Sequence, residues 1–342
     1  MVDLMPISDL YIYGVNWIGD AILSLATLEG VREKFPDIRM TVIPSSRTLD
    51  VYSLSPSVSS VLSRESLGPN SIKTGQESAT LCLPLSFRSA FDVWRLKLPN
   101  RVGYGSEGRS LFLNRTLNYQ KWKAKHLHQT SYYRELAESV LGTLPHKNPR
   151  LQIPEPLQEG ALAFMTANNL DNTIRIAINP GAYFGSAKMW PSRSYQALIQ
   201  KFLREIPDVS IVLFSGEKDK AVTREIAQSV NSPQVVSTDG RLPLTESIAL
   251  LSRCHYLVSN DSGMMHIGAA LNMKGIALFG PTDPVATGPM SDKIRILSHP
   301  VSCSPCFLRE CPIDHRCMEF LTPETVFPMI REDLLDLGAL IS

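Results

Sequence analysis

The residues with the clearest chemical potential form a short polar segment, Ser259–His266, which contains an acid, hydroxyls, a glycine and a histidine. An apolar run precedes this segment, and a helix is predicted to follow it. The first N–H groups of a helix have no partner inside the helix, and its dipole favours negative charge at that end. Gly263 lets a phosphate approach the backbone, so the pattern predicts an anion pocket. In the alternative interpretation, Asp261 or Ser262 caps an ordinary helix and His266 faces solvent.

A second segment, residues 179–191, follows the first predicted strand of the second half of the chain. Its glycines and small residues permit close backbone approach, and Lys188 supplies a mobile positive charge that suits a phosphate. The alternative is an ordinary connection that carries a solvated lysine.

Two acids stand where a predicted strand gives way to a helix. Asp219 can accept hydrogen bonds from ribose hydroxyls, or it can be an N-terminal helix cap. Asp20, at the end of Trp17-Ile18-Gly19-Asp20, can act as a general base if it faces a substrate, or it can be a helix-start acid. Ligands of open α/β sheets bind beyond the carboxyl ends of the strands, which is where these residues are predicted to lie.

Basic residues are concentrated in the later part of the first half of the chain. Such residues usually form a solvated face, although an acidic substrate requires them. They are Arg88, Arg95, Lys97, Arg101, Arg109, Arg115, Lys121, Lys123, Lys125, His126 and His128.

Four of the six cysteines lie in one segment near the end of the sequence. A reducing cytosol disfavours disulfides, which leaves a structural metal site, such as zinc, or free thiols. The spacing matches zinc templates only loosely, and His299 or His315 could replace a thiol as ligand. The four residues are Cys303, Cys306, Cys311 and Cys317.

The composition is that of an ordinary globular protein long enough for two domains. The chain has 342 residues, 44% hydrophobic content and a formal net charge of +1, which gives no case for nucleic acid as a partner. No stretch approaches the roughly 20 apolar residues of a membrane-spanning helix. Residues 1–6 lack the features of a signal peptide. We therefore expect a cytoplasmic protein that contacts a membrane only peripherally.

Short β-type runs alternate with amphipathic segments along the whole chain, which predicts an α/β fold with parallel sheets. In the first half we expect a helix from the 16–20 loop to about 35, an exposed loop at 63–78, and strands at 10–15, 39–44, 79–85 and 100–105. In the second half we expect helices at 157–168, 192–205, 221–230, 244–253 and 322–340, and strands at 174–179, 210–215, 234–237, 256–259 and 275–279.

The composition changes around residues 145–156, where prolines and polar residues break regular structure. We expect a first Rossmann-like domain over 1–160, a second over 161–321 and a closing helix over 322–342. The polar loops come from both halves, so the expected ligand site is a cleft between them. A Walker lysine motif and a G-x-S-x-G elbow are both missing from the sequence, which weakens ATPase and hydrolase interpretations.

Taken together, these segments resemble the ADP-heptose:lipopolysaccharide heptosyltransferases of glycosyltransferase family 9, and within that family the type II enzymes. The resemblance spans nearly the whole chain in order. The matching segments are Asn16–Ala21, Ser86–Ala90, Arg101–Tyr104 with Arg109, Pro180–Ala182, Ala187–Pro191, Asn260–His266, Phe279–Thr282, Cys303–Phe307 and Cys311-Pro312.

The resemblance implies a GT-B fold, in which two Rossmann-like domains face each other across a cleft. It implies an inverting glycosyltransferase that moves L-glycero-D-manno-heptose from ADP-heptose to the first heptose of a lipid A–Kdo–heptose acceptor. It requires no cofactor, since ADP-heptose is a co-substrate. Because the acceptor is anchored in lipid, we expect peripheral attachment to the inner face of the cytoplasmic membrane through basic residues.

The resemblance also implies roles for individual residues. Asp20 is the base that takes a proton from the acceptor hydroxyl. Acceptor binding is assigned to Arg88, Arg101 and Arg109. In donor binding, the diphosphate faces Lys188, the ribose faces Asp219, and the pyrophosphate and heptose face Asp261, Ser262, Gly263 and His266.

Tyr183 departs from the family pattern, because many type II sequences have an acidic residue at this position of the donor loop. An aromatic ring there can stack on a sugar or a base, or can fill the cleft. Two other functions therefore stay open: a GT-B glycosyltransferase with a different nucleotide-sugar donor, and a non-catalytic nucleotide-binding relative.

Overall fold

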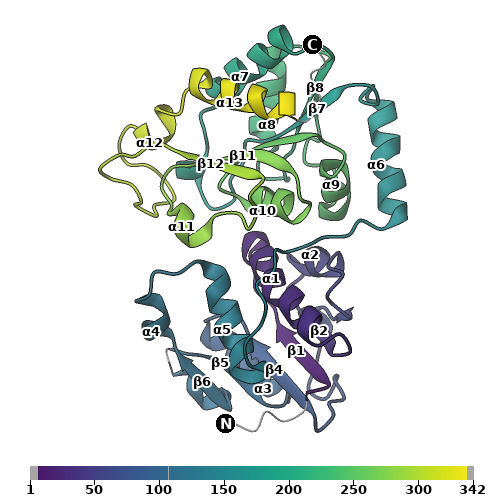
Figure 1. The fold of residues 1–342 in the computed structure, drawn as a ribbon, viewed down its shortest axis with the longest axis vertical. Coiled ribbons are helices and arrows are strands. Elements are labelled where there is room, and N and C mark those ends of the chain that lie inside the picture. Colours follow the sequence, from purple (N-terminus) through teal and green to yellow (C-terminus); the bar gives the residue numbers. More distant parts are fainter. Residues whose placement is uncertain (1–6, 107, 337–342) are drawn as a thin grey trace. The chain divides into compact units, whose positions relative to one another are not determined.

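The computed structural model describes residues 7–106 and 108–336 (Figure 1). The chain forms two compact units, the first ending at Gln152 and the second beginning at Ile153. Each unit contains one six-stranded parallel sheet with helices. The predicted α/β class with two parallel sheets is therefore confirmed. Residues 1–6, which the sequence analysis finds unlike a signal peptide, lie outside the described residues.

The sheet of the first unit has the order β3-β2-β1-β4-β5-β6. Its central strands are buried on both faces, which explains the continuous apolar run in β1. The strands are β1 (Asp9–Tyr13), β2 (Arg39–Ile43), β3 (Ser60–Val61), β4 (Ser78–Cys82), β5 (Arg101–Gly105) and β6 (Arg115–Asn118).

Helix α1 (Ile18–Lys34) follows β1, and its residues from Ala21 to Val31 are buried. Asp20 lies in its first turn and Arg32 and Lys34 lie in its last turn, an order that complements the helix dipole. The other helical segments of this unit are α2 (Leu49–Ser53), η1 (Arg64–Ser66), α3 (Phe87–Arg95), η2 (Arg109–Phe112), α4 (Tyr119–Lys123) and α5 (Gln129–Leu141).

The sheet of the second unit has the order β12-β11-β10-β7-β8-β9. Its core includes Trp190, whose indole N–H donates to the Leu321 carbonyl at 2.6 Å. The strands are β7 (Ile174–Asn179), β8 (Val209–Leu213), β9 (Val235–Ser237), β10 (Tyr256–Asn260), β11 (Lys274–Phe279) and β12 (Ile294–Ser298). The helical segments are α6 (Glu155–Ala167), η3 (Ser186–Lys188), α7 (Ser192–Glu205), α8 (Lys220–Val230), α9 (Leu244–Leu251), α10 (Gly263–Ala270), α11 (Pro284–Thr287), α12 (Arg316–Glu319) and α13 (Pro323–Asp336).

The division of the chain differs from the expected boundaries at two helices. The expected end of the first domain, residue 160, falls inside α6. This helix packs on α9 and belongs to the second unit. The closing helix is α13, which packs on α7 and so belongs to the second unit as well. The predicted extension of this helix beyond residue 336 lies outside the described residues.

Both sheets have the same arrangement of connections. In the first unit the chain proceeds outwards from β1 to β3 on one side and from β4 to β6 on the other side. In the second unit it proceeds from β7 to β9 and from β10 to β12. The order of the strands therefore reverses between β1 and β4 and between β7 and β10. At such a point, ligands of open α/β sheets bind beyond the carboxyl ends of the strands.

Candidate active site

The loops that follow β7 and β10 are held together by one buried amide. Asn260, the last residue of β10, is fully buried, and its Nδ2 donates to the Pro180 carbonyl at 2.8 Å. Its Oδ1 accepts the Trp190 backbone N–H at 3.0 Å and the Tyr195 hydroxyl at 2.8 Å. Since every one of these groups would be costly to bury alone, Asn260 fixes the 180–190 loop on the end of β10.

An ion pair joins these two loops at the start of α10. The Lys188 ammonium lies 2.5 Å from Oδ2 of Asp261, and the two side chains are 14% and 5% exposed. The same oxygen accepts the Thr282 hydroxyl at 2.6 Å. The Asp261 carboxylate is thus committed to Lys188 and Thr282, and the N-cap position of α10 falls to Ser262.

The residues around the first turn of α10 give it the character of an anion site. The Ser262 hydroxyl accepts Nδ2 of Asn179 at 3.0 Å and contacts the Ser259 hydroxyl at 3.1 Å. Gly263 begins the helix, and His266 is 5% exposed, so the alternative in which His266 faces solvent is wrong. Asp261 balances the charge of the Lys188 ammonium, so the first N–H groups and the dipole of α10 are the features that favour a diphosphate here.

Asp219 lies against the glycine of the donor loop. A Cβ built on Gly181 would approach Oδ2 of Asp219 to 2.5 Å, so only glycine fits beside this carboxylate. Burial raises the pKa of the Asp219 carboxyl above its ordinary value. Beside it, the Lys218 ammonium donates to the Tyr183 hydroxyl at 3.0 Å and lies 4.4 Å from the centre of the Tyr183 ring.

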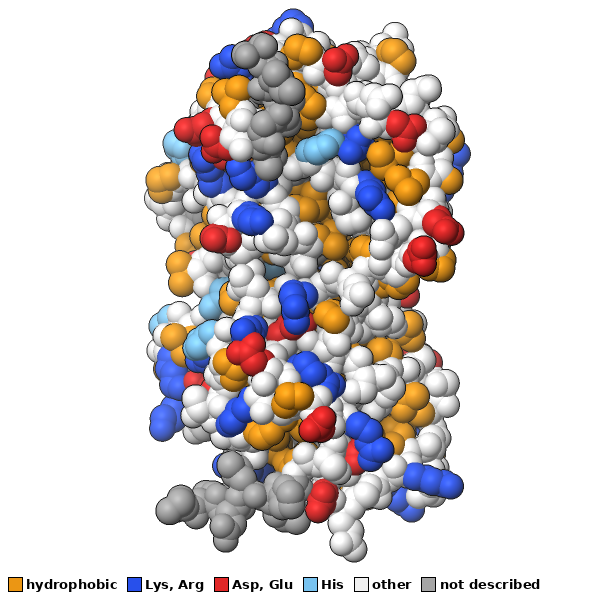
Figure 2. Space-filling view, turned by 45° about the vertical axis from the view of Figure 1, so that its right-hand side comes forward, with side chains coloured by type: hydrophobic (Ala, Val, Ile, Leu, Met, Phe, Trp, Pro, Cys, Tyr) orange, Lys and Arg blue, Asp and Glu red, His pale blue; other side chains and the backbone are white. Residues whose placement is uncertain are grey.

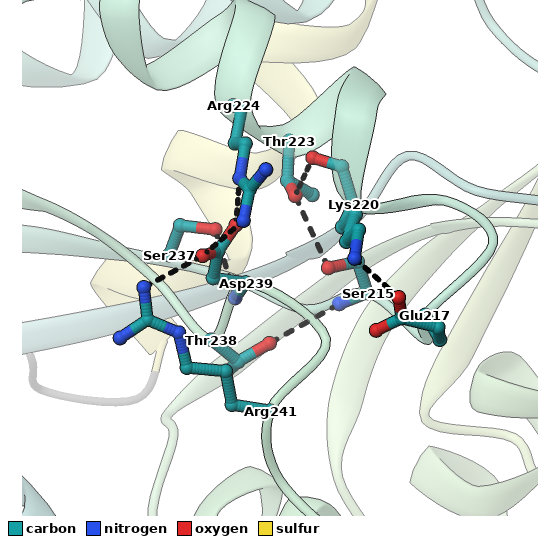
Figure 3. Close-up of polar contacts among 9 residues, drawn as sticks. All are labelled: Ser215, Glu217, Lys220, Thr223, Arg224, Ser237, Thr238, Asp239 and Arg241. Carbon is teal, nitrogen blue, oxygen red and sulfur yellow. Dashed lines mark hydrogen bonds and ion pairs between the residues drawn. The ribbon is translucent and has the colours of Figure 1, made fainter.

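Polar contacts join the loops after β8 and β9 to each other and to α8 (Figure 3). The Thr238 hydroxyl accepts the Ser215 backbone N–H at 3.3 Å, and the Thr223 hydroxyl donates to Ser215 at 3.1 Å. Asp239 accepts Arg224 and Arg241, and the hydrogen bond from Arg224 is the main reason why the pKa of Asp239 falls to about 2. This bracing holds the segment that presents Asp219.

The cysteine-rich segment packs on the donor loop. The Arg309 carbonyl accepts the Ala187 backbone N–H at 2.9 Å, and Nε2 of His315 donates to the Ala187 carbonyl at 2.7 Å. Within the described ranges, no group of three or more Cys, His, Asp or Glu side chains is arranged to hold a metal ion. Burial, and then the neighbouring Cys303, Cys311 and Cys306, raise the pKa of Cys317, so the four thiols lie near one another although they do not form such a group.

Asp20 lies at the carboxyl edge of the first sheet, half-buried in the first turn of α1. Two buried tyrosines, Tyr52 and Tyr133, are close enough for the Asp20 charge to raise their pKa values, although burial is the larger cause for both. The pKa of Tyr52 rises to about 12, so this phenol stays neutral. Asp20 is consequently placed where a substrate bound at the end of β1 would meet it.

The structure divides the three arginines that the sequence analysis groups as acceptor residues. Arg88 is exposed at the start of α3, and Arg109 is fully buried, with Nη2 at 3.0 Å from Sγ of Cys82. Both therefore belong to the carboxyl edge. Arg101 is the first residue of β5 and lies at the opposite edge, where it donates to the Leu98 and Phe112 carbonyls at 2.7 Å. The resemblance groups the three arginines, but Arg101 begins a strand, whereas Arg88 and Arg109 follow the ends of β4 and β5.

One further basic residue, which no sequence pattern predicts, lies at this edge. Arg64 falls in the segment predicted to be an exposed loop, yet its guanidinium donates to Asn16 at 3.0 Å and to the Gly14 carbonyl at 2.7 Å. It also stacks over the Tyr13 ring at 4.2 Å. Nε of Arg64 and Nε and Nη1 of Arg109 are buried and have no acceptor among the described residues. No local sequence pattern identifies Arg64. Its only signal is its position shortly after the end of β3 (Ser60–Val61).

Comparison with known proteins gives one consistent result. The sequence model of glycosyltransferase family 9 (heptosyltransferase) matches residues 70–316. Lipopolysaccharide heptosyltransferase 2 of Salmonella typhimurium is 28% identical over 310 residues, which cover 84% of this chain and 87% of that protein.

Two solved structures are similar over nearly the full length. ADP-heptose lps heptosyltransferase II of E. coli superposes with a TM-score of 0.78 and 26% identity, covering 96% of this chain and 99% of the other. The E. coli heptosyltransferase WaaC, solved with ADP, has a TM-score of 0.71 and 21% identity, with 95% and 99% covered.

Proposed function

The chain belongs to glycosyltransferase family 9, the heptosyltransferases, and from this premise we propose that it moves L-glycero-D-manno-heptose from ADP-heptose to the first heptose of the lipopolysaccharide inner core. One observation carries the proposal. Lys188 and the start of α10 meet at Asp261, at the point where the order of the second sheet reverses. This place has the charge and the backbone geometry that a sugar diphosphate requires.

On the donor side, the proposal gives each residue a physical task. When the donor binds, Lys188 gives up part of its contact with Asp261 and contacts the diphosphate. Gly263 lets phosphate oxygens reach the first N–H groups of α10. Asp219 accepts the ribose hydroxyls, and Ser262 and His266 contact the pyrophosphate and the heptose. As the bond between the anomeric carbon and the phosphate oxygen breaks, negative charge grows on the departing ADP. The ammonium and the helix start stabilise that charge, so transfer needs no divalent ion.

On the acceptor side, Asp20 is the general base. It takes the proton of the acceptor hydroxyl while the hydroxyl oxygen attacks the anomeric carbon from the face opposite to ADP, which inverts that carbon. The acidic groups of a phosphorylated, Kdo-bearing core are met by Arg88 and Arg64, with Arg109 behind them. The acceptor is anchored in lipid, so we further propose peripheral attachment to the inner face of the cytoplasmic membrane. Among the described residues, no helix is long and apolar enough to cross a bilayer.

Mass spectrometry of the reaction products tests this function. The purified protein is incubated with ADP-heptose and either a core acceptor that ends at Kdo or one that ends at the first heptose. We expect one heptose to be added to the second acceptor only. Addition to the Kdo-terminated acceptor would assign the earlier step, and no addition to either would refute heptosyl transfer to the inner core.

The donor loop makes a second donor worth testing in the same assay. Tyr183 pairs with Lys218 beside Asp219, at a position where the family resemblance leads us to expect an acid. ADP-glucose, UDP-sugars and GDP-sugars therefore form the comparison set. Faster transfer from one of these donors would replace ADP-heptose in the proposal and leave the roles of Lys188 and Asp261 unchanged. The zinc hypothesis for the cysteines stays a prediction, which metal analysis of the reduced protein tests.

A further inference from the structure

Helix α3 presents an aromatic stripe on the side where a surface helix normally carries polar residues. Its inward face contains Ala90 and Val93, both fully buried. Phe87, Phe91 and Trp94 follow one another at spacings of four and three residues, which places them on a common face. Phe87 is 47% exposed and Trp94 is 48% exposed. The sheet of the first unit therefore does not cover this stripe.

Helix η2 extends the stripe into a patch. The Phe112 ring lies 5.3 Å from the Phe87 ring, 5.4 Å from the Phe91 ring and 5.6 Å from the Trp94 ring, measured between centroids. Leu111, next to it, is 85% exposed. We call these five residues the aromatic patch. Contiguous exposed apolar surface of this kind marks a contact with another molecule or with a membrane.

The charges around the aromatic patch are positive. The Arg88 side chain is 79% exposed and the Arg95 side chain is 38% exposed, and Lys97 follows in the next turn. Asp92, the acid of α3, is only 7% exposed; it accepts the Tyr13 hydroxyl and Arg88, and Nε of Arg95 lies 3.9 Å from its carboxylate. One carboxylate thus faces two arginines, and with Lys97 this surface keeps a net positive charge.

This positive excess is local. Residues 86–128 contain nine Lys and Arg against two Asp and Glu, whereas the whole chain has a net charge of +1. On the face shown in Figure 2, basic and acidic side chains are both scattered among the others. A local basic and aromatic surface complements a surface that is both negative and apolar.

We propose that the aromatic patch inserts into the headgroup region of an anionic lipid bilayer, with Arg95 and Lys97 on the lipid phosphates. Tryptophan and phenylalanine at this depth, flanked by arginine and lysine, have the composition of an interfacial membrane helix. A bilayer offers the negative charge that the arginines need and the apolar layer that the rings need. A protein partner would have to supply both in one place.

The position of the patch fits the substrate. Helix α3 begins after β4, the strand next to β1, so Phe87 and Arg88 lie at the same sheet edge as Asp20. This part of the inference rests on the proposed function, in which the acceptor is anchored in lipid. Docking through the patch would then bring the carboxyl edge of the first sheet to the membrane surface that displays the acceptor.

Co-sedimentation with vesicles tests the proposal. The probes are vesicles of phosphatidylethanolamine with phosphatidylglycerol in about equal amounts, and vesicles of phosphatidylcholine alone. We expect binding to the anionic vesicles, weakened by high salt, and about tenfold weaker binding for the double variant Trp94→Ser/Leu111→Ser. The matched control is Phe320→Ser/Val285→Ser, two residues of similar exposure in the second unit, which should bind like the wild type.

Tryptophan fluorescence gives a second readout that does not depend on activity. Anionic vesicles should shift the emission of the wild type to the blue, and Trp94→Phe should keep vesicle binding but lose most of this shift. Equal vesicle binding by the wild type and the Trp94→Ser/Leu111→Ser variant would overturn the proposal. Patch-dependent self-association of the wild type without vesicle binding would overturn it as well, since a second copy would then cover the patch.

Activity separates this inference from the proposed function. The Trp94→Ser/Leu111→Ser variant should transfer heptose to a deacylated, water-soluble acceptor at the rate of the wild type. With the acceptor embedded in anionic vesicles, its rate should fall about tenfold. A wild type that binds vesicles through the patch but transfers no heptose would refute the proposed function and leave the docking surface standing.

Discussion

The carboxyl edges of the two sheets satisfy their polar groups in opposite ways. At the second sheet, Asn260 and Asp261 are buried and each has several partners within the protein. At the first sheet, Arg64 and Arg109 keep buried N–H groups for which no described residue is the acceptor. The second edge is preorganised by its own network, whereas Arg64 and Arg109 at the first edge have no carboxylate partner among the described residues.

This difference indicates how each edge meets its ligand. A preorganised site costs little reorganisation when it binds a small, invariant group such as a diphosphate. A buried polar group without a partner costs about 1–3 kcal/mol, so an edge with several of them gains most from an acidic ligand. We expect changes to the buried Lys188–Asp261 network at the second edge to affect both stability and function, and changes at the first edge to affect function alone.

The largest effect is expected for Asp20→Asn, which should lower the rate of transfer by about 10³-fold because the acceptor hydroxyl loses its base. Affinity for ADP, measured by calorimetry, should be unchanged, since ADP is assigned to the other edge. Asp50→Asn is the matched control, an acid in the first turn of α2, and should transfer normally. Transfer by Asp20→Asn at the wild-type rate would remove Asp20 from the mechanism.

Lys188→Met should combine a functional and a structural loss. The rate should fall about 10²-fold because the leaving ADP loses an ammonium. Asp261 is then left as a buried charge, so the free energy of unfolding should fall by about 3 kcal/mol. Chemical denaturation measures this loss, and adding Asp261→Asn should restore part of the stability without restoring the rate. An unchanged stability of Lys188→Met would contradict the proposed contrast between the two edges.

Arg109→Met tests the first edge in the same way. Replacing a buried guanidinium, to which the described part of the chain offers no ion pair, by an apolar side chain should change the free energy of unfolding by less than about 1 kcal/mol. The KM for the acceptor should rise about tenfold if the guanidinium attracts its acidic groups. Arg101→Met is the control, and should lose stability while its acceptor KM stays unchanged, because Arg101 is bonded to main-chain carbonyls at the opposite edge.

The smallest effect concerns pH. Burial raises the pKa of Asp219, so this carboxyl takes up a proton at a higher pH than an ordinary aspartate when the pH falls. ADP affinity should therefore begin to fall at a higher pH than an ordinary aspartate would give when the pH is lowered, and Asp219→Asn should bind more weakly at pH 7 with a flatter profile. The raised pKa means that the charged form opposes folding, so Asp219→Asn should unfold no more easily than the wild type at pH 7. A marked loss of stability in this variant would contradict the assigned role.

Central strands were predictable because they are continuously apolar. The predicted strand at 174–179 coincides with β7, and the family resemblance is confirmed. The edge strands β6 and β12 were missed because their exposed residues break the apolar run, as in Ile294–Ser298 with Arg295 and Ile296 exposed. Helix α3 was not predicted for a related reason: its exposed aromatic residues obscure the usual division of a helix into a polar and an apolar face.

The site was predictable as a set of residues but not as a set of contacts. Asp261 and Lys188 were both identified as site residues. They are far apart in sequence, however, and no local pattern predicts the ion pair between them. Asn260 was noted only as part of a motif, whereas its buried position at the end of a strand gives it the central structural role. Arg64 was missed because its neighbours have the composition of a loop, and only the tertiary fold brings it over Tyr13.

The contact between Gly181 and Asp219 joins the loop after β7 to the loop after β8. Because the two loops touch through bare backbone on one side and a carboxylate on the other, a side chain at position 181 would displace Asp219. Under the proposed roles, the width of a glycine then sets the distance between the group that faces the diphosphate and the group that faces the ribose. Substitution of Gly181 by alanine would reach the ribose through the displaced acid.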